Sequence, residues 1–286
     1  MAYAATIGFF DGVHLGHQYL LRQVRQAAAL HHTMSLAVTF RLHPQTVLRG
    51  ISPELLTSLS EREKALQQQV DTVLVIDFET IHTLTAQAFM QFLHDEHDVR
   101  LLLMGYDHRF GSDGTHHIED YIHWGEKAGV EVQIVEPMPG ETVSSSVIRR
   151  ALHAGDISTA NRLLGRPYTL NGEVVHGRGI GRKIGFPTAN LRPADPNRLI
   201  PCDGVYAVHV RLAEQLRPAL LNIGINPTVQ GTARTIEVHI PDFEGDLYQK
   251  TLSVQFLQRL RDEHHFASLA LLQARIAQDI AYLRAL

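Results

Sequence analysis

Cysteine is almost absent from this sequence, and long apolar runs are missing altogether. The 286 residues include one cysteine, Cys202, which excludes a disulfide within the chain and a zinc site built on cysteines. No apolar run approaches the roughly 18 residues of a membrane-spanning helix. No cationic segment followed by an apolar one opens the sequence. We therefore expect a cytoplasmic protein with no membrane partner.

An excess of positive charge is also lacking. The formal net charge is −4, so no overall basicity points to a nucleic-acid partner. The charges are nevertheless uneven, with 9 Lys and Arg against 18 Asp and Glu in residues 1–143, but 9 against 3 in residues 144–200. The cationic middle predicts a local site for an anionic ligand, and a solvated basic face is the alternative.

The length predicts two domains, and the first half has the pattern of an α/β fold. Strands are expected at 4–10, 35–40, 72–77, 100–105 and 131–136, and helices at 16–30, 60–70, 85–97 and 118–128. This alternation predicts a parallel sheet covered on both faces, with ligands beyond the carboxyl ends of its strands. Ser60 and Glu63 have the spacing of a capping box at the start of the second helix.

The pattern of predicted secondary structure changes near residue 165. Short helices over 145–153 and 157–164 end at Gly165, and Pro167 follows as a stop signal. Strands are expected next at 168–176, 204–211, 219–223, 234–240 and 252–257, before a final helix over 268–285. Short strands without intervening helices predict an antiparallel β-barrel with a terminal helix. We place the domains at 1–165 and 166–286.

The first cluster of candidate site residues follows the first strand. Glycines in this turn allow backbone N–H groups to approach a phosphate at a helix N-terminus. His14 and His17 are three residues apart, so both rings can face one side of the helix. They suit phosphate contacts or a metal, although no third ligand is evident, and two surface histidines are the alternative. The candidate phosphate-binding residues of this turn are Gly8, Phe10, Asp11 and Gly12.

A second candidate phosphate site lies at the start of the helix over 145–153. Ser145 and Ser146 offer hydroxyl and free N–H groups at its N-terminus, and Arg149 adds positive charge one turn later. A plain helix cap is the alternative.

The glycine-rich stretch from residue 177 is a third candidate. Gly177, Gly179 and Gly181 invite a dinucleotide-binding interpretation, but Pro187 follows where that fingerprint requires a helix. With Arg182 and Lys183, the glycines can form a phosphate-cradling loop, and a glycine-rich hairpin is the alternative. Thr188 and Asn190 would share one strand face, where their oxygens suit Mg²⁺ or phosphate.

These residues resemble a known family. The string Gly-Phe-Phe-Asp-Gly-Val-His-Leu-Gly-His over 8–17 is similar to the nucleotidyltransferase motif of the bacterial bifunctional riboflavin kinase/FAD synthetases. The segments 143–149 and 185–190 resemble two further motifs of that family, and so do the stretches that contain Glu237 and Arg261. The resemblance extends over essentially the whole chain.

The resemblance implies a nucleotidyltransferase-type first domain and a riboflavin kinase barrel. Such an enzyme phosphorylates riboflavin to FMN with ATP, then adenylylates FMN to FAD and releases pyrophosphate, with Mg²⁺ as cofactor. It implies Glu237 as the catalytic base, and Thr188 and Asn190 as Mg²⁺ and phosphate ligands. It implies catalytic roles for His14 and His17. The flavin-binding residues that it implies are Asp107, Asn222 and Arg261.

Three departures from the family pattern keep two alternatives open. Leu42 and His108 replace a proline and a phenylalanine, and no arginine follows Gly111. One alternative is a riboflavin kinase with a weakened adenylyltransferase domain. The other is a non-catalytic flavin- or nucleotide-binding regulator, against which a base such as Glu237 argues.

Overall fold

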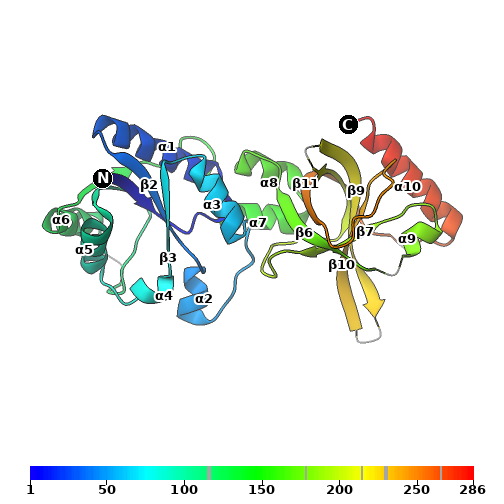
Figure 1. Ribbon diagram of the computed structural model, residues 1–286, viewed down its shortest axis with the longest axis horizontal. Coiled ribbons are helices and arrows are strands. Elements are labelled where there is room, and N and C mark those ends of the chain that lie inside the picture. Colours follow the sequence, from blue (N-terminus) through cyan, green and yellow to red (C-terminus); the bar gives the residue numbers. More distant parts are fainter. Residues whose placement is uncertain (115–116, 178, 214, 229–230, 265) are drawn as a thin grey trace. The chain divides into compact units, whose positions relative to one another are not determined.

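The computed structural model describes residues 1–114, 117–177, 179–213, 215–228, 231–264 and 266–286, without the side chains of residues 180, 183, 226–228 and 231–233 (Figure 1). The chain forms two compact units, Met1–Ser145 and Ser146–Leu286. In the part of the chain that the structure describes, no helix is long and apolar enough to cross a membrane.

The first unit is built on a parallel five-stranded sheet with the order β3-β2-β1-β4-β5. The strands are β1 (Tyr3–Ile7), β2 (Met34–Phe40), β3 (Thr72–Ile76), β4 (Val99–Gly105) and β5 (Glu131–Val135). β1 is central, with Ala5 paired to Leu36 on β2 and to Leu102 on β4. The chain order reverses direction at β1, and this is where α/β sheets bind ligands, at the carboxyl ends of the strands.

Helices cover both faces of this sheet, which confirms the predicted α/β architecture (Figure 1). Phe89, Met90 and Tyr121 pack against one face, and Leu21 and Val24 against the other. The helical elements are η1 (Asp11–Val13), α1 (Leu15–Leu30), α2 (Pro44–Arg49), α3 (Leu59–Gln67), α4 (Phe78–Ile81), α5 (Ala86–His97) and α6 (Ile118–Ala128).

The capping box of α3 differs from the sequence prediction. The N-cap is Ser58, whose Oγ accepts from the Glu61 N–H at 3.3 Å while Glu61 Oε2 accepts from the Ser58 N–H at 2.8 Å. The prediction of Ser60 and Glu63 was wrong because both pairs have the same spacing, and Ser58 is the residue with extended backbone.

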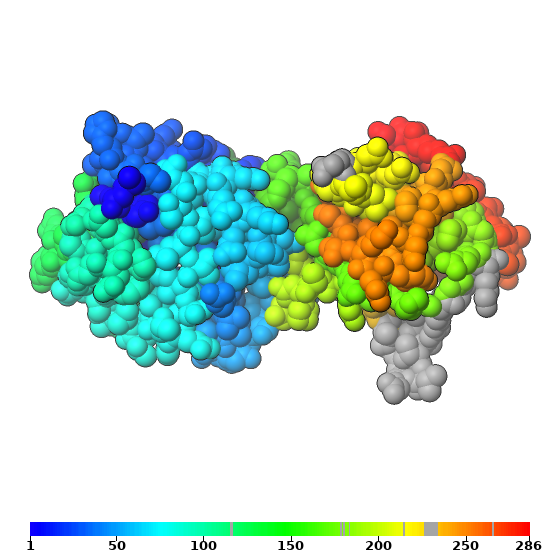
Figure 2. All heavy atoms as spheres, viewed as in Figure 1, coloured from blue at the N-terminus to red at the C-terminus, as the bar shows by residue number. Residues whose placement is uncertain are grey.

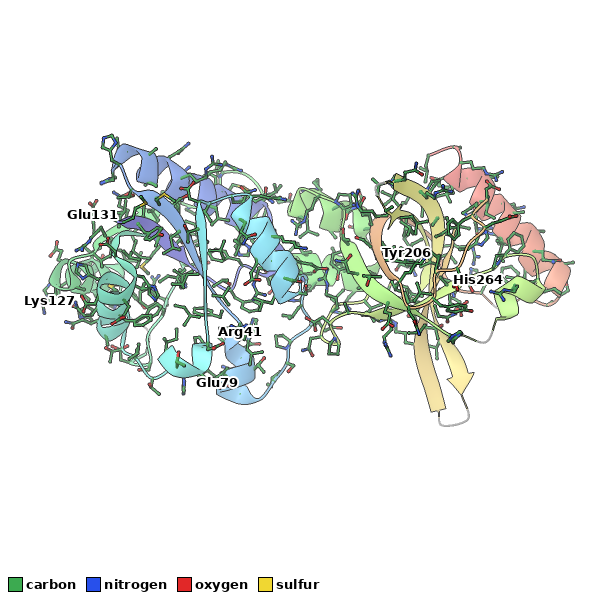
Figure 3. The ribbon with its side chains drawn as sticks, viewed as in Figure 1. Arg41, Glu79, Lys127, Glu131, Tyr206 and His264 are labelled. Atoms are coloured by element: carbon green, nitrogen blue, oxygen red, sulfur yellow. The ribbon has the colours of Figure 1, made fainter. Side chains whose placement is uncertain are left out.

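The second unit contains a closed six-stranded barrel with the order β10-β7-β6-β11-β8-β9, in which neighbouring strands are antiparallel. The strands are β6 (Thr169–Val175), β7 (Ala189–Pro193), β8 (Gly204–Leu212), β9 (Gln215–Thr228), β10 (Gly231–His239) and β11 (Thr251–Arg261). Fully buried Tyr206 lies among these strands (Figure 3). This confirms the predicted barrel, although β7 was missed and β9 is longer than expected.

In the described part of the chain, the barrel is accompanied by the helices α7 (Ser145–Ala154), which starts at the last residue of the first unit, α8 (Ile157–Leu164), α9 (Ile180–Lys183) and α10 (Leu269–Leu283). Asn161 on α8 donates from Nδ2 to the Phe256 carbonyl at 2.8 Å and accepts from the Tyr168 N–H at 2.7 Å. α8 ends at Gly165 in the left-handed conformation, as predicted. The compact division thus falls after Ser145, and the boundary near residue 165 stays a prediction.

α10 packs its apolar side on the barrel and forms part of the outer surface of this unit (Figure 2). Leu283, Ile276 and Ile280 contact Ala207 and Leu220. α10 is thereby fixed beside the strands that carry the second group of candidate site residues.

Candidate functional sites

The turn after β1 has the backbone that a tight strand-to-helix connection requires. Phe10, Gly12 and Val13 have φ values of 55°, 80° and 40°, in the left-handed region. Gly8 lies against the Phe10 ring, because a Cβ at Gly8 would meet that ring at 3.0 Å. The turn places the N-terminus of α1 at the carboxyl end of β1, where the sequence predicts a bound phosphate.

Asp11 is a structural anchor of this turn. Its buried carboxylate accepts hydrogen bonds from the Leu56 N–H at 2.9 Å, the Thr57 N–H at 3.0 Å and the Thr57 hydroxyl at 3.1 Å. Thr57 Oγ1 in turn accepts from the Gly12 N–H at 3.0 Å. Asp11 therefore joins the turn to the segment that precedes α3, a role that the motif alone did not predict.

His14 and His17 lie together at the start of α1. Their rings stack with centroids 3.6 Å apart, and His14 Nδ1 accepts from the His17 N–H at 3.3 Å as the helix cap. Burial lowers the pKa of His17 well below its usual value, and the neighbouring His14 lowers it further. The described residues contain no group of three His, Cys, Asp or Glu side chains that could hold a metal. The position of the stacked pair at the N-terminus of α1 suits it to hydrogen bonding with an anion.

The N-terminus of α7 begins beside this turn. The Ser145 hydroxyl donates to the Asp11 carbonyl at 3.0 Å. A Cβ at Gly16 would lie 3.2 Å from the Val143 carbonyl oxygen, so this glycine allows the segment before α7 to approach α1. Ser146 and Arg149 follow Ser145 in α7.

The segment after β4 contains two of the departures from the family pattern. Burial lowers the pKa of His108 to about 4; the neighbouring Asp107 opposes this lowering, and Arg109 adds to it by a smaller amount. His108 is thus an uncharged ring at neutral pH, 5.9 Å from the Phe110 ring. It retains the aromatic character of the phenylalanine that it replaces. Asp107 beside it is exposed.

The residues in place of the family arginine hold the start of α5. Asp113 Oδ1 accepts from the Ala86 N–H at 3.0 Å, and the Ser112 N–H donates to the Leu84 carbonyl at 2.9 Å. Gly111 has a φ of 108° and passes so close that a Cβ would lie 2.6 Å from Ala86 N. Ser112 and Asp113, which stand where the family has an arginine, therefore have a structural role at the start of α5.

Sequence reasoning missed Arg62, a fully buried arginine in α3. Its Nη2 donates to the Phe40 carbonyl at the end of β2 at 2.6 Å, and its guanidinium carbon lies 4.1 Å from the centre of the Phe9 ring. Arg62 thereby joins the ends of β1 and β2. A charged residue in a polar helix gives no signal of such burial before the helix is packed.

The second unit has a cavity of 630 Å³ beside the barrel. This volume is typical of a small-molecule site. His264, labelled in Figure 3, lines it on the side where α9 is drawn. The sequence-predicted residues that line it are Gly177, Gly179, Gly181, Thr188, Asn190, Asn222, Glu237 and Arg261.

Strand register brings the polar members of this set into one row. Glu237 on β10 is paired with Asn190 on β7 and with Asn222 on β9. Residues paired across antiparallel strands point to the same face, so the three side chains are neighbours. The Thr188 hydroxyl donates to Glu237 Oε2 at 3.0 Å, and Asn222 Nδ2 donates to Glu263 Oε1 at 3.2 Å.

Glycines allow the 177–181 loop to approach this row. A Cβ at Gly177 would lie 2.0 Å from Asn190 Nδ2, and one at Gly181 would lie 3.1 Å from Thr188 Oγ1. The one-turn helix α9 within the loop was not expected. Arg182 is exposed, and the side chain of Lys183 lies outside the described part of the chain.

Arg261 reaches the cavity wall from the end of β11. Its Nε donates to Asp279 Oδ2 on α10 at 2.9 Å, and its Nη2 lies 2.9 Å from the same oxygen. Asp279 was not identified from the sequence, because nothing in its helix indicates that it pairs with a residue 18 positions earlier.

Comparison with known proteins assigns a family to both units. A family model described as FAD synthetase matches residues 2–147, and one described as riboflavin kinase matches residues 164–286. A bifunctional riboflavin kinase/FMN adenylyltransferase from Pseudomonas fluorescens is 39% identical over 99% of this chain and 92% of its own length. The enzyme of the same description from Escherichia coli K12 is 36% identical over 96% of this chain and 89% of its own.

A solved structure agrees over nearly the whole chain. It is described as a macrolide-efflux protein from Streptococcus pneumoniae and matches with a TM-score of 0.90 and 34% identity, covering 99% of this chain and 94% of that one. The fold and the family models that match its two parts are those of a flavin-processing transferase. The chain belongs to the bifunctional riboflavin kinase/FMN adenylyltransferase family.

Proposed function

We propose that this chain phosphorylates riboflavin to FMN with ATP, and adenylylates FMN to FAD with a second ATP. The observation that carries the proposal is the Glu237–Thr188–Asn190 cluster in the barrel cavity of a chain that also matches FAD synthetase. Riboflavin, FMN and FAD are then substrates and product. Residues 1–165 carry the adenylyl transfer and residues 166–286 the kinase reaction, in the cytoplasm.

In the kinase reaction, the primary hydroxyl of riboflavin attacks the γ-phosphorus of ATP. Glu237 accepts the hydroxyl proton, the new P–O bond forms FMN, and ADP leaves. The Thr188 hydroxyl, 3.0 Å from Glu237 Oε2, holds the carboxylate in position. Asn222 and Arg261 contact the flavin side of the cavity.

The oxygen donors around Glu237 fit Mg²⁺. Thr188 and Asn190 would supply a hydroxyl and an amide carbonyl, hard ligands that this ion takes together with phosphate oxygens, beside the Glu237 base. Bound there with ATP, Mg²⁺ neutralises negative charge on the phosphates. The backbone of the 177–181 loop, with Arg182 and Lys183, cradles the remaining phosphate oxygens.

In the adenylyl transfer, an FMN phosphate oxygen attacks the α-phosphorus of ATP. The bond to pyrophosphate breaks and FAD forms, so no protein nucleophile is needed. His14 and His17 donate hydrogen bonds to the phosphates, while the turn over 8–12 and the start of α7, Ser145, Ser146 and Arg149, hold the triphosphate. Asp107 contacts the flavin of FMN.

One assay tests the whole proposal. The purified chain is incubated with riboflavin, ATP and Mg²⁺, and flavins are separated by chromatography over time. The proposal expects FMN first and FAD afterwards. FMN without FAD supports the riboflavin-kinase alternative, and flavin binding with no product supports the regulator.

A further inference from the structure

The strongest unassigned feature of the kinase cavity is the carboxylate of Asp279. This side chain comes from α10, is 5% exposed, and lines the cavity together with Arg261. Its two oxygens accept hydrogen bonds from different arginines: Oδ2 accepts from Arg261, and Oδ1 accepts from Arg275 Nε at 3.1 Å. One carboxylate therefore joins the end of β11 to two turns of α10.

The geometry holds the guanidinium of Arg261 in one orientation. Nε and Nη2 both lie 2.9 Å from Asp279 Oδ2, and Nη1 donates to the Asp262 carbonyl at 3.2 Å. The guanidinium carbon also lies 5.8 Å from the centre of the Phe266 ring, on the segment that leads into α10. A planar group held at three nitrogens and beside a ring has little freedom to rotate.

The charges do not cancel at this point of the cavity wall. Two guanidinium groups share one carboxylate, so the cluster keeps one net positive charge. Arg275 is 42% exposed and does not line the cavity, whereas Arg261 is 11% exposed and does. Arg261 therefore presents its charge to the cavity, whereas Arg192 and Arg234, which also line it, are paired with Glu173 and Asp203.

We infer that Asp279 is a positioning residue for riboflavin, which aims Arg261 at an acceptor oxygen of the flavin. This inference rests on the proposed kinase function. Asp279 would act through Arg261, since each of its oxygens already accepts from an arginine. The Arg261 bonds are made before the ligand arrives, so binding loses little conformational freedom.

The test is the Asp279→Asn variant in the full-length chain. Asparagine retains the shape but cannot pair with both guanidinium groups. We expect the KM for riboflavin to rise about 10-fold or more with kcat changed less than about threefold, the pattern of a lost binding contact. FAD formation from added FMN in the same preparation should be unchanged. A role confined to attaching α10 would lower thermal stability without this separation of KM from kcat.

Four further variants, with Arg261→Gln as the reference for two of them, make the result decisive. Arg275→Gln removes the other partner of the same carboxylate and should leave the riboflavin KM within about twofold, since Arg261 keeps its bonds. Adding Asp279→Asn to Arg261→Gln should have no further effect on KM, because the first residue acts through the second. Arg261→Lys retains the charge but not the planar fork, and should match Arg261→Gln.

Two outcomes overturn the inference: a wild-type KM in Asp279→Asn, or additive effects in the double variant. If Asp279→Asn does not fold, the Arg261→Lys variant decides, since a wild-type KM there shows that orientation is unimportant. The proposed function fails separately, if the wild-type chain makes no FMN. Riboflavin affinity, measured by flavin fluorescence, then still decides whether Asp279 acts on binding.

Discussion

At the residue scale, burial sets the charge state of two histidines in the first unit, His17 and His108. His17 has a pKa well below its usual value because it is buried beside His14, and burial lowers that of His108 to about 4. A neutral imidazole has one donor and one acceptor nitrogen. At neutral pH, His17 and His108 therefore provide hydrogen bonds and ring contacts without positive charge.

The depressed pKa of His108 makes a pH-dependent prediction. The unfolded chain binds this proton near pH 6.5 and the folded chain only near pH 4, so this residue lowers stability as the pH falls between the two. We expect an NMR titration, assigned with His108→Phe, to show the ring neutral at pH 5. His108→Phe should also stabilise the protein more at pH 5 than at pH 7. A midpoint above pH 6 contradicts this.

Glu237 should be required for one activity alone. Loss of a general base costs about 10²- to 10⁴-fold in rate, so Glu237→Gln should reduce FMN formation by that factor. FAD formation from added FMN should persist in the same sample. Exposed Glu244 gives the matched control, and Glu244→Gln should behave as the wild type. Equal losses of both activities would contradict separate sites.

At the element scale, the sites depend on how helices begin. His14 caps α1, and Asp11 fixes the turn before it to the segment before α3. The capping box of α3 then fixes the start of the helix that carries Arg62. The two caps fix where α1 and α3 begin, and the Asp11 contacts join these two helix starts near the carboxyl end of the sheet.

The corrected capping box of α3 is directly testable. Ser58→Ala removes the N-cap and should destabilise the first unit by about 1 kcal/mol, whereas Ser60→Ala should cost less than about 0.5 kcal/mol. The single tryptophan, Trp124 in α6, reports on this unit, so urea unfolding followed by its fluorescence measures both. A larger loss of stability for Ser60→Ala than for Ser58→Ala would instead identify Ser60 as the N-cap.

At the scale of the whole molecule, two units of different fold carry two clusters of polar residues. The kinase cavity is lined from within the second unit, and the His14–His17 pair lies in the first. Glu237 and His17 thus lie in different units, and we expect each to be required for one activity alone.

Mixing two inactivated chains tests this separation. Glu237→Gln alone and His17→Ala alone should each fail to convert riboflavin to FAD. Mixed in equal amounts, they should restore FAD, because FMN released by the His17→Ala chain diffuses to the other. Chromatography of FAD over time measures this, with His31→Ala in place of His17→Ala as the exposed-histidine control. No FAD from the mixture would mean that FMN must pass within one chain.

Much of both folds and sites could be predicted from the sequence, for physical reasons. Short apolar strands between helical patterns specify a parallel sheet, and alternating strands such as β6 specify a barrel wall. The predictions that failed concern short segments whose sequence pattern does not single out one structure. The spacing of Ser58 and Glu61 also occurs at Ser60 and Glu63, and β7 lacks the apolar run of the predicted strands and ends at Pro193.

The sequence by itself determined the family, the two-part organisation and the motif residues, because glycines, turn-forming residues and apolar periodicity act over a few positions. Only the tertiary structure decided the partners of the charged groups. Asp11 turns inward to Leu56 and Thr57, Arg62 is buried beneath Phe9, and Asp279 holds Arg261. The cost of burying a charge is met by a partner from a distant element, and the chain order does not specify that partner.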